Sequence, residues 1–114
     1  MPTATAETTL IVRRPRWDHS LVDAHTLVLT ILPDIDWNDS RRVRRFVERY
    51  QDVRVVSCDC RHVDITSTAA IGWLITLYRW TLQHGIDFKV VNPPASSLAA
   101  YRSQGLDGLL PFAA

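Results

Sequence analysis

The sequence is poor in glycine and cysteine, and each shortage excludes a class of site. Only four glycines occur in 114 residues, and they form no glycine-rich loop that could cradle phosphate groups. We therefore predict no cofactor, and any ATP would belong to a partner. The only cysteines, Cys58 and Cys60, share one face of a predicted strand and are badly placed to bridge each other. No Cys or His pair has a metal-like spacing, so we predict no metal site and expect buried free thiols in a reducing compartment.

Excess charge and long apolar runs are missing as well. Thirteen basic and twelve acidic residues give a net charge of +1, so bulk electrostatics provide no reason to expect nucleic-acid binding. The most apolar segment, Ala69 to Leu82, is interrupted by Arg79 and is too short to span a bilayer, which argues against direct membrane insertion. Residues 1–7 lack the basic and apolar regions of a signal peptide. The sequence therefore predicts a cytoplasmic protein.

Hydrophobic periodicity predicts one α/β domain over residues 8–114, preceded by a flexible polar tail over residues 1–7. The expected strands are residues 8–12, 25–32, 53–59 and 88–91, and the expected helices are residues 40–50, 67–84 and about 96–104. Residues 13–23 are expected to form a turn or loop between the first two strands. Early strands followed by strand–helix alternation predict a mixed sheet of about four to five strands with covering helices.

The long helix predicted over residues 67–84 is apolar on two faces. One stripe is expected to face the core: Ile71, Leu74, Ile75, Tyr78 and Leu82. Trp73 and Trp80 lie on a different face, and core packing is their default explanation. A helix that is apolar on two faces also needs a second partner, which would be another helix or another copy of the chain. A homo-oligomer is therefore a further hypothesis.

Three consecutive hydroxyl residues, Thr66, Ser67 and Thr68, stand directly before that helix. The order of strand, turn, hydroxyl and helix presents Ser67 at the positive end of a helix, which favours phosphate chemistry. The simpler alternative is that these hydroxyls only cap the helix. The other two helices are expected to be capped by Asn38 or Asp39 and by Ser96 or Ser97.

Arginines crowd the helix predicted over residues 40–50. They flank its apolar stripe and are Arg41, Arg42, Arg44, Arg45 and Arg49. One interpretation is a contact with an acidic partner, and the other is a solvated helix face, which is the more common case. Nucleic acid is the weaker hypothesis, because the chain is nearly neutral and has no matching basic strand or loop.

Short motifs over residues 25–112 resemble, in order and spacing, those of the STAS domain family, which includes bacterial anti-sigma-factor antagonists. Thr66-Ser67-Thr68-Ala69 resembles the family's Asp-Ser-Ser/Thr-Gly signature, and Val55 to Asp59 resembles its strand ending in Asp. The other matching segments are Pro33-Asp34-Ile35-Asp36, Gly85 to Asn92 and Gly105-Leu106-Asp107.

The resemblance implies a partner-switching function. In the family, the first Ser of the signature is phosphorylated by a partner kinase that is also an anti-sigma factor. That position is Ser67 here, with Thr66 and Thr68 as less favoured acceptors. The partner would be an anti-sigma factor or another kinase-like ATPase. The implied partner-binding residues are Asp34, Asp36, Asn38, Thr66, Ser67, Thr68, Ala69 and Ile71. Asp59 is expected to support this surface through hydrogen bonds.

Two departures from the signature keep other functions open. Thr66 replaces the family's Asp, and Ala69 replaces its Gly. The runner-up hypothesis is a non-phosphorylated STAS subunit of a larger complex, such as a transporter or a stress-signalling scaffold. A small hydrolase using Ser67 is the weakest hypothesis, because only His62 lies near it in sequence and no oxyanion-hole motif is evident. We therefore predict no catalytic residues and no enzyme.

Overall fold

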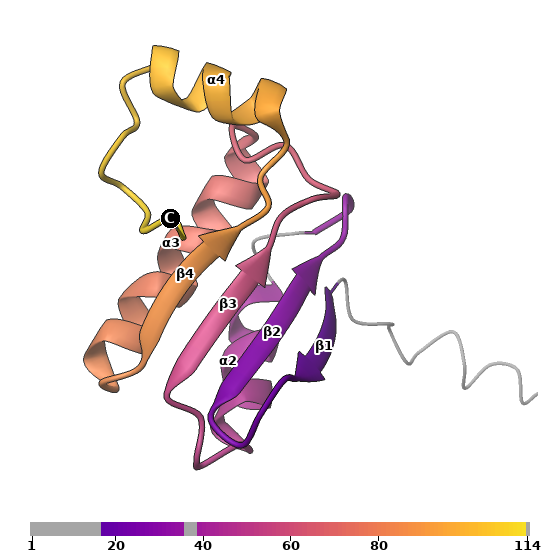
Figure 1. The fold of residues 1–114 in the computed structure, drawn as a ribbon, viewed down its shortest axis with the longest axis vertical. Helices are drawn as coiled ribbons and strands as arrows, with labels where there is room; N and C mark the ends of the chain where they lie inside the picture. The colour runs from indigo at the N-terminus through magenta and orange to yellow at the C-terminus, as the bar shows by residue number, and fades with distance from the viewer. Residues whose placement is uncertain (1–16, 36–38, 114) are drawn as a thin grey trace, which may run out of the picture.

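Helices cover one face of a four-stranded sheet in the computed structural model, which describes residues 17–35 and 39–113 (Figure 1). Helices α2 and α3 pack behind the sheet, and α4 lies across one end of the molecule. In chain order the elements are β1 (Trp17–Leu21), β2 (Thr26–Ile31), α2 (Ser40–Glu48), β3 (Val55–Asp59), α3 (Thr68–Gln83), β4 (Asp87–Val91) and α4 (Ala95–Ser103). The mixed α/β sheet with covering helices confirms the predicted fold class.

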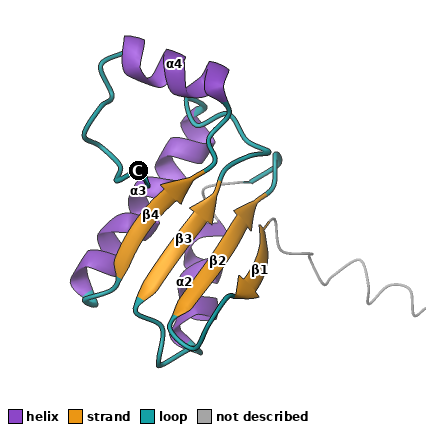
Figure 2. Cartoon of the chain, viewed as in Figure 1, coloured by secondary structure: helices purple, strands orange, loops and turns teal. Residues whose placement is uncertain are grey.

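The sheet has the order β1-β2-β3-β4, with β1 antiparallel to β2 and the other pairs parallel. Cys58 lies between Leu29 and Val90 in register, so an apolar row crosses the three parallel strands. These side chains are fully buried, as is typical of a parallel sheet covered by helices. The parallel arrangement also places the carboxyl ends of β2, β3 and β4 at the same edge (Figure 2).

The prediction of a loop over residues 13–23 was wrong, because Trp17–Leu21 forms the edge strand β1. Only Trp17 of these five residues is buried, and it pairs with Ile31 across the hairpin. The segment therefore lacks the alternation of apolar and polar residues by which a strand is recognised in a sequence. The strand predicted over residues 8–12 lies outside the described residues, as does the proposed tail.

The predicted inner stripe of α3 was confirmed in part, because Leu74 is buried and Ile75 and Tyr78 are half-buried and pack against the core. The side chains of Trp73, Leu77 and Trp80 are buried, whereas Leu82 is 60% exposed and Ile71 is only half-buried. Leu74 is the one member of the predicted stripe that is buried. Because most of this helix is apolar all round, periodicity alone could not identify the inner face. Trp73 and Trp80 pack in the core, which confirms the simpler of the two explanations given for them.

Helix caps differ from the prediction at α4 and agree at α2. The N-cap of α4 is Pro94 rather than Ser96 or Ser97, and the Ser97 hydroxyl donates to the Pro94 carbonyl at 3.0 Å. Asp39 is the N-cap of α2, but its carboxylate makes an ion pair with Arg42 at 3.7 Å instead of a capping hydrogen bond. Asn38, the alternative cap of α2, lies outside the described residues. Gly85 follows α3 with φ +68°, a conformation that glycine adopts at little cost.

Both cysteines are buried free thiols, and this position predicts their reactivity. Burial, together with the nearby Asp59 charge, raises the pKa of Cys60 to about 12, and burial raises the pKa of Cys58 as well. Because only the thiolate reacts readily, we expect negligible alkylation of the native protein at neutral pH and complete alkylation in denaturant. Intact-mass measurement after iodoacetamide treatment tests this, and rapid native labelling of either cysteine would contradict the buried placement.

Candidate functional site

The candidate site lies where the parallel strands end. The segments that follow β2, β3 and β4 all leave the same edge of the sheet, and α3 begins there (Figure 2). In open α/β sheets this edge is the usual position of binding sites. The Asp34 side of the site and the hydroxyl cluster are thus brought to one end of the molecule, although they are far apart in sequence. Asp36 and Asn38 lie outside the described residues.

Ser67 is the N-cap of α3 and is exposed. Its backbone is extended, with φ −67° and ψ 144°, and its Oγ accepts a hydrogen bond from the Ala70 N–H at 3.2 Å. The Ser67 carbonyl also accepts from the Ile71 N–H at 2.9 Å, which makes it the first carbonyl of the helical ladder. A capping role uses the hydroxyl oxygen as an acceptor and leaves the hydroxyl proton available. Capping and phosphate acceptance are therefore compatible at this residue.

Asp64 holds the loop that presents Ser67, and the sequence analysis missed it. Its Oδ1 accepts from the Thr66 N–H at 2.8 Å and from the Thr66 hydroxyl at 2.5 Å, and its carbonyl accepts from the Ser67 N–H at 3.1 Å. The Thr66 hydrogen bonds lower the pKa of this carboxyl, so it is ionised at neutral pH. An Asp two residues before a Thr is a recognisable turn pattern, and that spacing could have identified Asp64.

Asp59 is buried at the end of β3 and fixes the beginning of the same loop. Its carboxylate accepts from Arg61 Nε at 3.1 and 2.9 Å and from the Arg61 backbone N–H at 3.1 Å, and it forms an ion pair with Arg61 Nη2 at 2.7 Å. Burial raises the pKa of Asp59, but the Arg61 hydrogen bonds and charge outweigh burial and hold it below the ordinary value of 3.8. The loop over residues 61–66 is thus anchored by Asp59 at one end and Asp64 at the other.

The remaining candidate residues surround this loop. Asp34, Thr68 and Ala69 are exposed, Thr66 and Ile71 are half-buried, and all belong to the segments that leave the carboxyl edge of the sheet or to the first turn of α3. Thr68 is the first residue of α3, next to the Ser67 cap. Ser67 and Thr68 therefore have exposed hydroxyl side chains at this helix start, whereas the Thr66 hydroxyl donates a hydrogen bond to Asp64.

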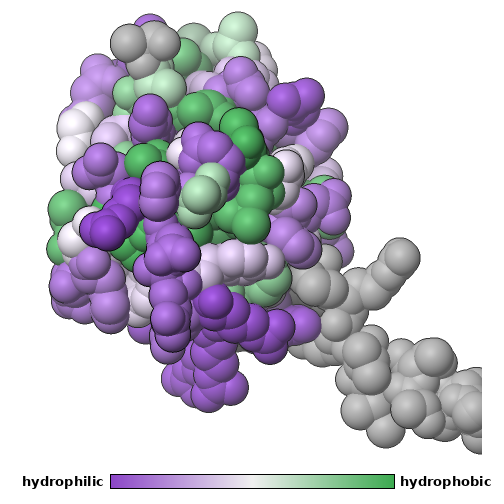
Figure 3. All heavy atoms as spheres, turned by 60° about the horizontal axis from the view of Figure 1, so that its bottom comes forward, coloured by the Kyte–Doolittle hydropathy of each residue, from purple (hydrophilic) through white to green (hydrophobic). Residues whose placement is uncertain are grey.

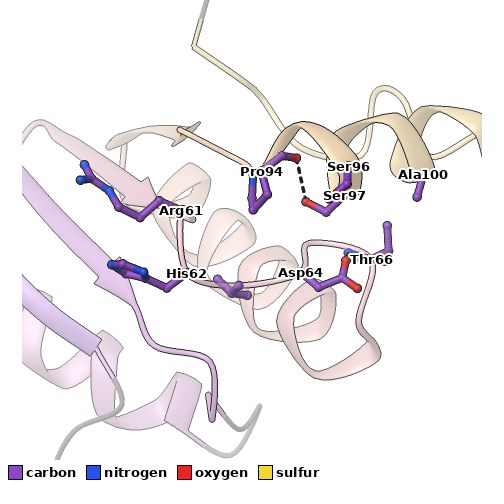
Figure 4. A pocket seen from close by; sticks show the side chains of 9 residues that line it. Arg61, His62, Asp64, Thr66, Pro94, Ser96, Ser97 and Ala100 are labelled. Atoms are coloured by element: carbon purple, nitrogen blue, oxygen red, sulfur yellow. Dashed lines mark hydrogen bonds between the residues drawn. The ribbon is translucent and has the colours of Figure 1, made fainter.

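A cleft of about 470 Å³ separates the loop from α4. Figure 4 shows Asp64 and Thr66 facing Pro94, Ser96, Ser97 and Ala100 across it. The side chains of Arg61 and His62 point away from the facing residues in this view. His62 is exposed, and among the described residues no hydrogen bond joins it to Ser67. The polar lining of the cleft thus consists of one carboxylate, that of Asp64, and the hydroxyls of Thr66, Ser96 and Ser97, with Arg61 and His62 at one side.

In residues 17–35 and 39–113, no three His, Cys, Asp or Glu side chains are grouped so that they could hold a metal ion. None of the helices in this part of the chain has the length and apolar character needed to cross a membrane.

The Asp59–Arg61 pair predicts a pH-dependent stability. We expect Asp59→Asn to lower the free energy of unfolding by about 1–2 kcal/mol at neutral pH, because it removes charge-assisted hydrogen bonds to a half-exposed guanidinium. Because the pKa of Asp59 is lowered by folding, this contribution is present above the ordinary Asp value of 3.8 and is lost as the pH falls through the lower folded value. Urea unfolding at neutral and acidic pH measures it, and a difference between variant and wild type that grows in acid would contradict the assignment.

The chain is similar to one known protein family and to solved protein structures. A family model described as STAS domain matches residues 20–114. The anti-sigma factor antagonist SpoIIAA in its unphosphorylated form has a TM-score of 0.60 and 14% identity, over 86% of this chain and 88% of that chain. The Bacillus cell fate determinant SpoIIAA in its phosphorylated form has a TM-score of 0.59 and 13% identity, over 86% of this chain and 91% of that chain. A search of curated proteins finds no match.

Proposed function

The chain belongs to the STAS domain family, and we propose from this premise that it is a regulatory protein-binding module similar to anti-sigma-factor antagonists. It binds a kinase-like anti-sigma factor in the cytoplasm, and phosphorylation of Ser67 releases that partner. The module itself has no enzymatic activity, and the ATP belongs to the kinase. The observation that carries this proposal is the exposed Ser67 at the N-cap of α3, presented by a loop that is anchored at both ends.

The likeness to two forms of SpoIIAA supports a phosphorylation switch. One of those structures is described as unphosphorylated and the other as phosphorylated, and both have this fold. A phosphate at Ser67 would add a charge of about −1.5 to −2 at neutral pH. The N-terminal end of α3 favours an anion by roughly 0.3–1 kcal/mol, so the phosphate would not unfold the helix. The switch therefore acts at the interface, where the new charge must be desolvated against the partner.

The partner-binding surface in this proposal extends from Ser67 to the neighbouring loops. Thr68 and Ala69 contribute the exposed first turn of α3, and Asp34 contributes the segment after β2. Asp36 and Asn38 complete the surface in the proposal. Asp59 and Asp64 support this surface, since the hydrogen bonds of their carboxylates are made within the loop and not toward a partner.

Two residues favour a second candidate function. Ala69 places an exposed Cβ where the family signature has Gly, and the Thr66 hydroxyl is turned onto Asp64 where the signature has a carboxylate. Both changes alter the surface that a kinase must approach. A STAS subunit that binds a transporter or a stress-signalling scaffold without being phosphorylated would tolerate them.

Affinity purification of the wild-type protein from its native host, with bound proteins identified by mass spectrometry, separates the two functions. Recovery of a protein with a histidine-kinase-like ATPase domain is the expected result. Ser67→Ala should recover the same protein, although loss of the cap costs it about 1 kcal/mol of stability. A transporter or scaffold protein as the sole specific partner would contradict the first function and support the second.

A further inference from the structure

Three arginines form a charged ridge along α2 and its C-cap, and the ridge runs from the carboxyl edge of the sheet toward the opposite end of the molecule. Arg41, Arg45 and Arg49 follow one another at intervals of four residues, which places them on one face of the helix. All three are exposed. We call Arg41, Arg45 and Arg49 the arginine ridge. Its length is about 12 Å, from the eight helical rises that separate residues 41 and 49.

The arginine ridge has no acidic partner among the described residues. In that part of the chain, ion pairs are formed by Arg42 with Asp39 and by Arg61 and Arg102, but not by the ridge. Arg42 also lies over the Trp17 ring at 5.8 Å. Like charges four residues apart destabilise a helix by roughly 0.2–0.5 kcal/mol per pair. The arginine ridge therefore destabilises the fold slightly, and a role in binding would account for arginine at these three positions.

The ridge leads to a partly apolar cleft at the end of the molecule opposite Ser67. The cleft has a volume of about 440 Å³, and Arg49 lines it together with Leu21 and Tyr50. Leu21 is 47% exposed, and the adjacent Val22 is 66% exposed. Figure 3, in which this end comes forward, shows a hydrophobic area at the centre with strongly hydrophilic residues gathered below it.

The wall of the cleft is held in place by ring contacts. Tyr50 packs edge-on against Phe46 with ring centroids 5.3 Å apart, and Phe46 in turn packs against His19 at 4.5 Å. The hairpin that carries Leu21 is also fixed, because a hydrogen bond of 2.9 Å joins His25 Nδ1 to the Asp52 carbonyl oxygen. A partner would thus meet a preformed depression, which lowers the ordering cost of binding.

We propose that the arginine ridge and this cleft bind an acidic amphipathic segment of a second protein partner. Acidic side chains of the segment pair with Arg41, Arg45 and Arg49, and an apolar side chain enters the cleft beside Leu21. The cleft lies at the end of the molecule opposite Ser67, whereas Arg41 stands in the first turn of α2, close in sequence to residues 34–38 of the proposed Ser67 surface. The proposed interaction itself does not require phosphorylation of Ser67. It would let the domain hold a scaffold protein while the Ser67 end exchanges partners.

Charge favours an acidic protein over a nucleic acid at this surface. Glu48 interrupts the arginines, and Asp52 lines the cleft. A phosphate backbone brings evenly spaced charges against both carboxylates, whereas a peptide can place its acidic residues opposite the arginines alone. The exposed apolar side chain of Leu21 also matches an apolar anchor, which a phosphate backbone does not offer.

Binding of labelled synthetic peptides to the full chain tests the proposal by fluorescence anisotropy. One peptide carries leucines at helical spacing along one face and glutamates at the other positions. The second peptide is identical except that each leucine is replaced by serine. We expect the leucine peptide to bind about tenfold more tightly than the serine peptide and both to weaken as salt is added. Leu21→Ser should remove most of the difference between the peptides. Equal binding of the two peptides to wild type would overturn the role of the cleft.

Arg45→Glu is the decisive variant. A carboxylate at position 45 pairs with Arg41 and Arg49, so thermal stability should stay the same or rise, while affinity for the leucine peptide should fall about tenfold. Arg102→Glu makes the same change of charge on α4 and should leave the affinity unchanged. Equal losses in the two variants would overturn the proposal, as would tighter binding of a DNA duplex or of anionic lipid vesicles than of the leucine peptide.

Discussion

Replacing Trp73 by alanine is expected to lower the free energy of unfolding by about 3–5 kcal/mol, the largest loss of stability that we predict for a single residue. The Trp73 side chain is fully buried and is the largest of the fully buried side chains. Its removal deletes the apolar contacts of an indole ring and leaves a cavity between α3 and the sheet that the neighbours can fill only in part. Chemical denaturation with fluorescence or circular dichroism measures the loss.

Two control variants separate burial from other effects of changing α3. Leu82→Ala changes an apolar residue of the same helix that is 60% exposed, so we expect it to lower the free energy of unfolding by less than about 0.5 kcal/mol. Trp73→Phe keeps a ring in the core and removes the indole N–H, which has no hydrogen-bond partner in the described structure, so its cost should be well below that of alanine. A larger loss for Leu82→Ala than for Trp73→Ala would show that α3 packs through its other face.

Replacing Ser67 by aspartate is expected to weaken binding of the kinase-like partner by about 2–5 kcal/mol, or roughly thirtyfold or more in Kd. The added carboxylate must be desolvated at the interface without a partner group placed to receive it. Within the domain the same carboxylate is tolerated, because aspartate is a good N-cap and the helix dipole favours it. Stability should therefore be unchanged while binding is lost, which distinguishes a switch from simple unfolding.

Ser20→Asp provides the matched control for this prediction. Ser20 is an exposed serine on β1, outside the loops at the carboxyl edge of the sheet, and its change adds the same charge. Titration calorimetry with the purified partner should show normal affinity for Ser20→Asp and for Ser67→Ala. Similar losses with Ser20→Asp and Ser67→Asp would mean that net charge, rather than the position of Ser67, governs binding.

Periodicity was enough to predict the elements that form the centre of the fold. Three strands and three helices appear where apolar alternation or helical spacing is clear, with ends that differ by a few residues. The edge strand Trp17–Leu21 was not predicted, because most of its residues are polar and its formation depends on pairing with β2. The inner face of α3 was predicted only in part, for the opposite reason, since apolar residues cover too much of the helix surface for a pattern to favour one face.

The candidate site was predictable in its position and not in its supporting hydrogen bonds. The hydroxyl cluster before an apolar helix pattern pointed to the N-terminus of α3, and Ser67 is its N-cap. Asp64 was not predicted, because the family signature has its carboxylate directly before Ser67, where this chain has Thr66. The structure shows that a carboxylate two residues earlier holds the loop through the Thr66 amide and hydroxyl.

In the proposed function, phosphorylation of Ser67 controls partner binding. The most direct test is phosphate mapping by tandem mass spectrometry on the protein isolated from its host, in the partner-bound fraction and in the free fraction. Under the proposed function, phosphate is expected on Ser67 in the free fraction and is expected to be absent from Ser67 in the bound fraction. Phosphate on Thr68 or Thr66 instead, or an equal degree of phosphorylation in both fractions, would contradict it.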